Sequence, residues 1–480
     1  MSYLRGPDRA EVQFLPPCLD DYVRPECPAR FIDVYVESLD FQGLGFGHAQ
    51  PADTGRPSYH PADLLKLYVY GYLHRIRSSR RLEAEAGRNL ELIWLLRGLR
   101  PDFKTIADFR KDNVAVFKKL LKEFNLLCRK LDLFGAELVA IDGSKFKALN
   151  NTRRYYTQEQ LEELVKRIDS RIEAYLGGLD HQDQEAQGVR ATPNREVLEQ
   201  KVALLKERKG RYGELLGELA GTQQTAVSLT DADARKMKGL HGHLIGYNVQ
   251  VAVDTKHDLI VTQQVVQEAN DRGQLAVMAI AAKEELGTQE LQVVADGGYH
   301  EAEQLEICEQ AKIQAFVPEP IGSSGLGKGG KPIFPKQKFH YDAAPDAYRC
   351  PAGQVLKRVR QDTNHGKERV VYFNEEACAG CALRSQCTTG RYRLITRRLN
   401  EAVVERAAQR LAVAGPGVLA TRKETVEHVF GTLRNWTHDV FLMRGLNKVR
   451  GEFSLSAMVY NLRRVLNLVS LERLLEAVAH

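Results

Sequence analysis

The 480-residue sequence contains no apolar run that approaches the length of a membrane span, and its first residues, Met1–Asp8, lack the apolar core of a signal peptide. These absences argue against a membrane protein and a secreted one, so we expect a cytoplasmic protein. Neither charge sign is in large excess, because 68 Lys and Arg stand against 62 Asp and Glu. With 43% hydrophobic residues the chain is an ordinary globular protein, long enough for two or three domains or large inserts.

Cysteine is also scarce, and four of the eight cysteines are grouped. Cys378 and Cys381 form a C-x₂-C pair, and Cys387 lies six positions further on. Cys350 opens a Cys-Pro-Ala-Gly segment, which is typical of a sharp turn. Four thiolates in a Gly- and Pro-rich segment predict a tetrahedral structural zinc site; a redox-active cluster is the alternative, and a reducing cytoplasm disfavours disulfides. The other four show no such grouping: Cys18, Cys27, Cys128 and Cys308.

Two apolar runs share the same ending, an aspartate followed directly by glycine. The first, Val139–Ser144, contains Asp142, and the second, Val293–Gly298, contains Asp296. A short continuous apolar run predicts a strand buried on both faces, and the glycine allows a sharp turn that leaves the carboxylate at the strand's open end. Ligands of such sheets bind at these ends, so the two carboxylates are predicted to meet. The alternative is that each Asp-Gly is only a turn.

A third carboxylate, Glu427, lies in a predicted helix far downstream. It stands beside the apolar face of that helix, which is formed by Val426, Val429, Phe430 and Leu433. Oxygen ligands suit Mg²⁺ or Mn²⁺, and two such ions can activate an attacking oxygen and stabilise a leaving one at phosphorus. Our hypothesis is that Asp142 bridges two Mg²⁺ ions, that Asp296 completes one site and that Glu427 completes the other.

Basic residues gather around and after this glutamate. The segment Thr388–His480 has 15 Lys and Arg against 8 Asp and Glu. Such a surplus suits a polyanionic partner such as DNA, although it is equally typical of a solvated surface. Three cations lie within two helical turns of Glu427 and are predicted to position the DNA backbone: Arg422, Lys423 and Arg434.

The first part of the chain predicts a small all-α unit with a basic rim. The segment Pro61–Leu73 begins with proline, as the first turn of a helix tolerates, and apolar helical patterns recur around Trp94 and through Leu120–Leu127. A helix-turn-helix DNA reader and a helical bundle that packs on the core both fit this pattern. An arginine cluster favours DNA contact and predicts recognition of DNA by Arg75, Arg77, Arg80 and Arg81.

Two heptad-like patterns follow in the middle of the chain. Apolar residues recur at spacings of three and four over Leu161–Tyr175 and again over Leu198–Leu219, with the turn-prone Gly177–Gly178 between them. Thr157 and Gln160 predict a capping box at the start of the first pattern. The simplest interpretation is a helical hairpin inserted into the core.

The remaining pattern predicts a mixed α/β sheet. After the first aspartate strand come an alternating strand over Gly246–Asp254, its hairpin partner over Leu259–Thr262 and a helix over Gln274–Leu286. The second aspartate strand, another helix and a strand at Ala315–Val317 complete the order. Three antiparallel neighbours followed by strands that are joined through helices indicate a ribonuclease H-like core.

Taken together, these segments resemble the bacterial DDE insertion-sequence transposases, which share a ribonuclease H-like core. The resemblance covers nearly the whole chain and rests on six segments: Thr105–Arg110, Ile141–Ser144, Gly246–Asp254, Ala295–Tyr299, Arg422–Gly431 and Tyr460–Arg464. The chain departs from the family at one place. Many relatives carry a tyrosine about two helical turns before the glutamate, and Leu419 stands near that position here.

The resemblance implies a DNA transposase that binds the ends of its insertion sequence and catalyses metal-dependent strand cleavage and strand transfer, with Asp142, Asp296 and Glu427 as catalytic residues. It implies double-stranded DNA as partner, a homodimer on DNA and a nucleoid-associated cytoplasmic location. A metal-dependent DNA nuclease and a non-catalytic DNA-binding protein derived from such an element are the alternatives. The expected organisation is a helical DNA-binding domain at 1–130 and a catalytic domain at 131–480, with a helical-hairpin insert at 151–230 and a cysteine-rich insert at 321–400.

Overall fold

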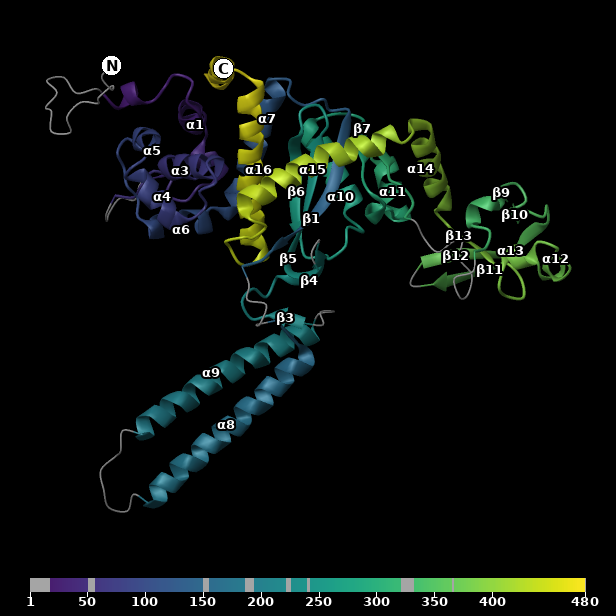
Figure 1. The fold of residues 1–480 in the computed structure, drawn as a ribbon, viewed down its shortest axis with the longest axis horizontal. Coiled ribbons are helices and arrows are strands. Elements are labelled where there is room, and N and C mark those ends of the chain that lie inside the picture. Colours follow the sequence, from purple (N-terminus) through teal and green to yellow (C-terminus); the bar gives the residue numbers. More distant parts are fainter. Residues whose placement is uncertain are drawn as a thin grey trace, which may run out of the picture.

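The computed structural model describes residues 18–50, 57–149, 155–185, 194–221, 226–239, 242–320, 332–364 and 367–479. Parts of both predicted inserts, at 151–154 and 321–331, lie outside these ranges. A mixed sheet stands at the centre, helices pack around it, and a helical hairpin and a small β-rich unit project from it (Figure 1). Among the described helices, none combines the length and the apolar character that a bilayer span requires.

The central sheet has a mixed topology in the order β6-β5-β1-β7-β8, with the short β4 also paired to β5. β5 pairs antiparallel with β1 and β6, whereas β7 runs parallel to both β1 and β8. This arrangement confirms the predicted α/β class and the ribonuclease H-like core. The strands are β1 (Leu138–Lys147), β4 (Arg235–Gly239), β5 (Gly242–Asp254), β6 (Leu259–Val266), β7 (Leu291–Val294) and β8 (Ile313–Phe316).

The helices of the second half pack on this sheet and on one another. α15 crosses the sheet and contacts β1, β5 and β7, while α16 packs against β6 and against α7 of the N-terminal part (Figure 1). α10 packs against β5 and β6, and α11 contacts β8 and α14. Their bounds are α10 (Leu275–Leu286), α11 (Ala302–Gln310), α14 (Glu401–Ala414), α15 (Gly417–Thr437), α16 (Leu446–Leu468) and α17 (Leu471–Ala479).

The N-terminal part is all α, as predicted, and shares one hydrophobic core with the sheet. Asn125 of α7 links the two through hydrogen bonds to the carbonyl oxygens of Ile260 and Val261, and it accepts one from Asn461 of α16. This part therefore packs on the core as a bundle. Its helices are the 3₁₀ turn η1 (Leu19–Tyr22), α1 (Pro28–Glu37), α2 (Phe41–Leu44), α3 (Pro61–Leu73), α4 (Ser79–Ala86), α5 (Leu90–Leu95), α6 (Phe103–Asp112) and α7 (Val114–Lys130).

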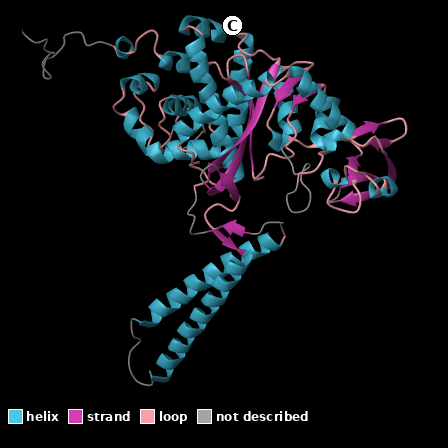
Figure 2. Ribbon diagram, turned by 45° about the vertical axis from the view of Figure 1, so that its right-hand side comes forward, coloured by secondary structure: helices cyan, strands magenta, loops and turns pink. Residues whose placement is uncertain are grey.

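The heptad-like segment forms the predicted hairpin, which projects away from the sheet (Figure 2). Its helices α8 (Gln158–Glu185) and α9 (Asn194–Ala220) rise from the small ladder of β2 (Tyr155–Thr157) and β3 (Ala226–Ser228). The predicted capping box is confirmed, because the Gln160 N–H donates to Thr157 Oγ1 and the Thr157 N–H donates to Gln160 Oε1. The capping box satisfies backbone donors that the first helical turn would leave open.

The cysteine-rich segment forms a small unit with a core of its own. Its five strands pair in the order β13-β12-β11-β10-β9, and aromatic and aliphatic side chains such as Tyr348 and Leu356 fill their shared face. The elements are η6 (Lys336–Lys338), β9 (His340–Asp342), β10 (Ala347–Arg349), β11 (Val355–Asn364), β12 (Lys367–Phe373), α12 (Glu375–Ala379), α13 (Arg384–Cys387) and β13 (Ile395–Arg398).

Candidate active site

Strand register places two of the predicted catalytic aspartates side by side. β1 and β7 are parallel neighbours in which Ala140 lies opposite Val294. Asp142 and Asp296 each follow two residues later, so they lie at the same level of adjacent strands: Asp296 comes just after the end of β7, and Asp142 lies within β1, which continues to Lys147. Asp296 also starts the 3₁₀ turn η3 (Gly297–Tyr299), and its Oδ1 accepts the Gly298 N–H at 2.8 Å.

The Asp142 carboxylate is largely enclosed and has a cationic partner. Its side chain is 21% exposed, and its Oδ2 lies 3.1 Å from Arg422 Nη1 of α15. Burial raises the pKa of Asp142 to about 6; Arg422 acts against this shift, and the negative charges of Asp296 and Asp271 add to it. The charged form of Asp142 is therefore disfavoured mainly by burial, and a bound cation would stabilise it.

A third carboxylate at this place, Asp271, was not predicted from the sequence. Its Oδ1 accepts hydrogen bonds from Asn248 Nδ2 at 2.8 Å and Gln250 Nε2 at 2.7 Å, and the Lys145 ammonium lies 3.2 Å away. A sequence signal did exist. Asn248 and Gln250 are polar residues two positions apart in an apolar strand, so they share one face and, when buried, need a polar partner.

Tyr299 lies among all three aspartates. Its buried hydroxyl donates to Gln250 Oε1. Burial raises the pKa of Tyr299 well above its usual value, and Asp271, Asp142 and Asp296 each raise it further. All three carboxylates therefore lie in the surroundings of one hydroxyl group, although in the described part of the chain they do not stand as close together as ligands that share a metal ion.

Glycine is required beside Asp142 because the side chains around it leave no room. A Cβ at Gly143 would lie 2.3 Å from Gln250 Nε2 and 2.4 Å from Asp271 Oδ1. Both distances are shorter than real Cβ atoms show, so any other residue would push the polar side chains apart. The predicted turn is absent here, because β1 continues through Asp142 and Gly143 to Lys147; the glycine of this Asp-Gly pair instead serves close packing at the site.

The structure does not bring Glu427 into this group. Glu427 lies on α15 with an exposed side chain, and among the described residues it has no hydrogen-bond or ion-pair partner. Arg422, five residues earlier on the same helix, is the residue of α15 that reaches Asp142. In the described part of the chain, no three His, Cys, Asp or Glu side chains stand close enough together to form a metal-binding group.

The other two predicted DNA-binding cations of α15 differ in the contacts that they make with the rest of the protein. Arg434 Nη2 donates to Ser144 Oγ of β1 at 2.5 Å and its Nε lies 3.3 Å from Asp439 Oδ1, whereas Lys423 is exposed. Arg422 and Arg434 thus tie the helix to the strand that carries Asp142. The basic face near Glu427 lies along the rim of the carboxylate cluster.

Among the N-terminal arginines, Arg77 stands apart. Its guanidinium donates to the carbonyl oxygens of Thr437 and Val440 and pairs with buried Glu452 at 2.7 Å. It is 10% exposed, so we assign Arg77 to joining the N-terminal helices to α15 and α16 and leave it out of the DNA-binding set. The remaining three are exposed: Arg75, Arg80 and Arg81.

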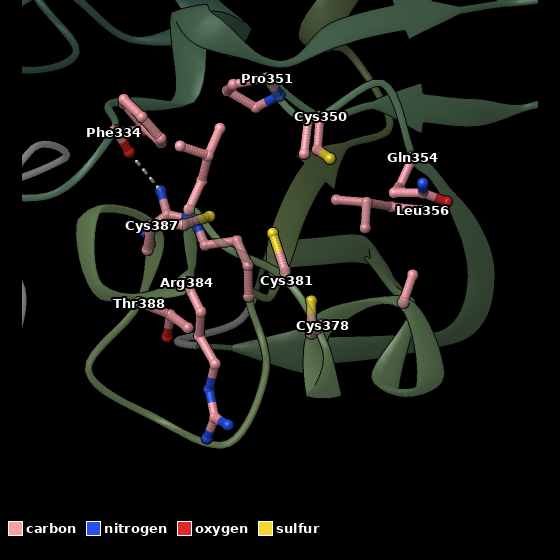
Figure 3. Close-up of a pocket in the computed structure, with 14 residues that line it drawn as sticks. Phe334, Cys350, Pro351, Gln354, Leu356, Cys378, Cys381, Arg384, Cys387 and Thr388 are labelled. Carbon is pink, nitrogen blue, oxygen red and sulfur yellow. Dashed lines mark hydrogen bonds between the residues drawn. The ribbon is translucent and has the colours of Figure 1, made fainter.

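The four grouped cysteines line one small cavity of about 20 Å³ in the β-rich unit. Figure 3 shows the sulfur atoms of Cys350, Cys378 and Cys381 turned toward one another, with Cys387 on the adjoining wall. Burial raises the pKa of the Cys387 thiol; Arg393 opposes this shift, and the other three thiols add to it. A cavity of this size has room for one water-sized guest.

Two segments of the chain match known protein families. Residues 17–112 match the family described as a transposase domain (DUF772), and residues 349–466 match the family described as a transposase DDE domain. The second match contains Glu427 and all four grouped cysteines. No curated protein matches the chain. The cryo-EM structure of the piggyBac transposase synaptic complex with hairpin DNA is similar at 8% identity and a TM-score of 0.27, covering 94% of this chain and 79% of that chain. A TM-score this low supports no argument about fold or function.

Proposed function

We propose that the chain is an insertion-sequence DNA transposase of the DDE type, as the two transposase family matches support, and that it cleaves DNA at the ends of its element and joins them to target DNA. One observation supports the proposal: Asp142 and Asp296 lie at the same level of neighbouring parallel strands, and the Asp271 carboxylate lies close to the glycines that follow them, Gly143 and Gly298. Phosphoryl transfer needs little covalent chemistry from the protein, because most of the catalysis is positioning and charge stabilisation.

We propose that Asp142, Asp296 and Glu427 hold the two divalent cations. The enclosed Asp142 carboxylate beside two further aspartates supports this role, and a set of oxygen ligands favours Mg²⁺ or Mn²⁺. When bound, such ions activate the attacking oxygen and stabilise the leaving oxygen of an in-line displacement at phosphorus. For this role Glu427 must join the two aspartates, and no partner among the described residues holds its exposed carboxylate in another place.

We propose that cleavage and joining are two successive displacements at phosphorus, during which basic side chains hold the DNA backbone. In cleavage, a water oxygen bonds to the phosphorus and the bond to the leaving oxygen breaks, which leaves a 5′-phosphate and a 3′-hydroxyl. In joining, that 3′-hydroxyl oxygen bonds to a target phosphorus and a target strand is broken. Arg422 lies against Asp142, where it can bind a phosphate oxygen, and Lys423 and Arg434 hold the backbone on either side.

Strand joining is the experiment that tests this function. The protein is incubated with Mg²⁺ and a mini-element flanked by its own ends, and we expect products in which element ends are joined to target DNA. Cut ends without joining would instead establish a hydrolytic nuclease, since one site can use either nucleophile. Bound but uncut DNA would establish a non-catalytic DNA-binding protein. Double-stranded DNA as partner and a homodimer that holds two ends remain our predictions, to be measured on the same substrate.

We further propose that Cys350, Cys378, Cys381 and Cys387 bind one structural zinc ion. The supporting observation is that all four thiols line a single small cavity, and zinc thiolate sites close small units whose apolar core is limited. Metal analysis should find about one zinc per chain. The double variant Cys378→Ser, Cys381→Ser should lose it, and the unit should become sensitive to protease.

Cys18→Ser is the matched control, because Cys18 is exposed and lies outside the cluster. It should keep the zinc and the protease resistance of the wild type. Full zinc content in the double variant would contradict the assignment. A wild-type protein that contains no zinc would do the same.

A further inference from the structure

A groove of about 370 Å³ lies on the side of α15 that faces α16 and the end of α3. Arg75, which follows α3, and Arg463 of α16 line it together with the amides of Asn435 and Asn467. We propose that this groove binds the phosphate backbone of the DNA strand that enters the active site. The inference rests on the proposed function, because it assigns a second contact to the same DNA.

The groove carries positive charge that the protein leaves uncompensated. No Asp or Glu is among its lining residues. Arg464 is neutralised by Asp258 at 2.8 Å, but in the described part of the chain neither Arg75 nor Arg463 has a carboxylate partner. Arg75 donates only to Asn435 Oδ1 at 3.3 Å, which leaves further N–H groups of its guanidinium open. Two such cations beside neutral amide donors match the chemistry of a phosphodiester.

The aromatic residues of the groove favour phosphate over base recognition. Trp436 is 6% exposed and Tyr460 1%, and the Arg463 guanidinium lies 5.5 Å from the centre of the Trp436 ring. Stacking of a base requires an open ring face. These rings offer almost none, so the groove can hold a backbone but has no platform for a base.

Gly431 leaves the surface of α15 uncovered between the groove and Glu427. It lines the groove, is exposed in the interior of α15, and a Cβ there would meet nothing within 4 Å. Glycine weakens a helix relative to alanine, and nothing inside the chain requires it at this position. It lies one turn, about 6 Å, beyond Glu427 on the same helix, so a strand at Glu427 can continue across it into the groove.

The test measures binding of the full-length protein to a fluorescein-labelled duplex of arbitrary sequence, without added Mg²⁺, as a function of salt. Arg463→Gln should weaken binding by about tenfold at low salt and reduce the slope of log K against log salt by about one, as expected when one phosphate contact is lost. Arg473→Gln is the matched control, since Arg473 is an exposed arginine of α17 outside the groove. It should leave the affinity and the slope unchanged.

A second pair of variants separates binding from folding. Gly431→Gln should raise the melting temperature, because it removes a helix-interior glycine, and should still weaken DNA binding by covering the path. Gly213→Gln is matched to it, since Gly213 is an exposed glycine of α9 with equally open surroundings. That control should raise stability without changing DNA affinity. Wild-type affinity and slope in both Arg463→Gln and Gly431→Gln would overturn the proposal.

The binding assay needs no strand cleavage, so failure of the groove is distinguishable from failure of the proposed function. Whether the proposed function is correct is decided separately, by the presence of joined products. If a groove variant binds DNA weakly while the wild type joins strands, the results support both the groove assignment and the proposed function.

Discussion

Asp142→Asn should lower the rate of strand cleavage by about 1,000-fold, equivalent to about 4 kcal/mol of transition-state stabilisation, while DNA binding changes little. The amide keeps the size of the side chain but removes the charge that holds the cations. Binding persists because the variant keeps every cationic side chain that we assign to the phosphate backbone, including Arg422 beside it. Asp296→Asn and Glu427→Gln should show the same split between cleavage and binding, which gel assays and single-turnover kinetics measure directly.

The matched control for this series is Asp132→Asn. Asp132 is 90% exposed in the turn after α7 and has a positive φ of 56°, a conformation that asparagine accepts readily. This variant should cleave like the wild type. Cleavage at a normal rate by Asp142→Asn would contradict the site assignment. Glu427→Gln is the most informative of the three, because Glu427 is the one predicted ligand that the structure leaves apart from the others.

Glu452→Ala should lower the free energy of unfolding by about 3–5 kcal/mol, the cost of leaving a buried charge without its partner. Glu452 is 1% exposed and accepts hydrogen bonds from Arg77 and from the N–H groups of Leu442 and Met443. Its removal leaves the buried Arg77 guanidinium without a counter-charge and two amides without acceptors where the N-terminal helices meet α16. Urea denaturation followed by circular dichroism measures the loss.

Glu472→Ala provides the comparison for this prediction. Glu472 is an exposed residue of α17, and surface changes of this kind stay within about 0.5 kcal/mol. The double variant Arg77→Leu, Glu452→Leu should lose less than the two single variants together, because it leaves no unpaired charge. Equal losses in Glu452→Ala and Glu472→Ala would show that the buried pair does not stabilise the junction.

Local patterns in the sequence determined the strands and two of the carboxylates. The apolar runs before Asp142 and Asp296 predict strands buried on both faces, and β7 does end just before Asp296, whereas β1 continues through Asp142 and Gly143 to Lys147. The predicted meeting of the two carboxylates rested on two strand ends at one edge of the sheet; the residues do lie side by side, because β1 and β7 are parallel neighbours, but only Asp296 follows a strand end. The capping box at Thr157 and the helical hairpin could likewise be predicted from the sequence, because both depend on interactions between residues three and four positions apart.

Only the tertiary structure decided which polar and charged groups meet across long sequence separations. Asp271 joins the site because β5 places Asn248 and Gln250 beside it, and no pattern around Asp271 itself indicates this. Arg77 looked like a free cation in the sequence, yet it pairs with Glu452, 375 residues away. The reason is that strand and helix periodicity follows from backbone geometry along the chain, whereas the partner of a charge depends on packing between elements that the chain brings together only on folding.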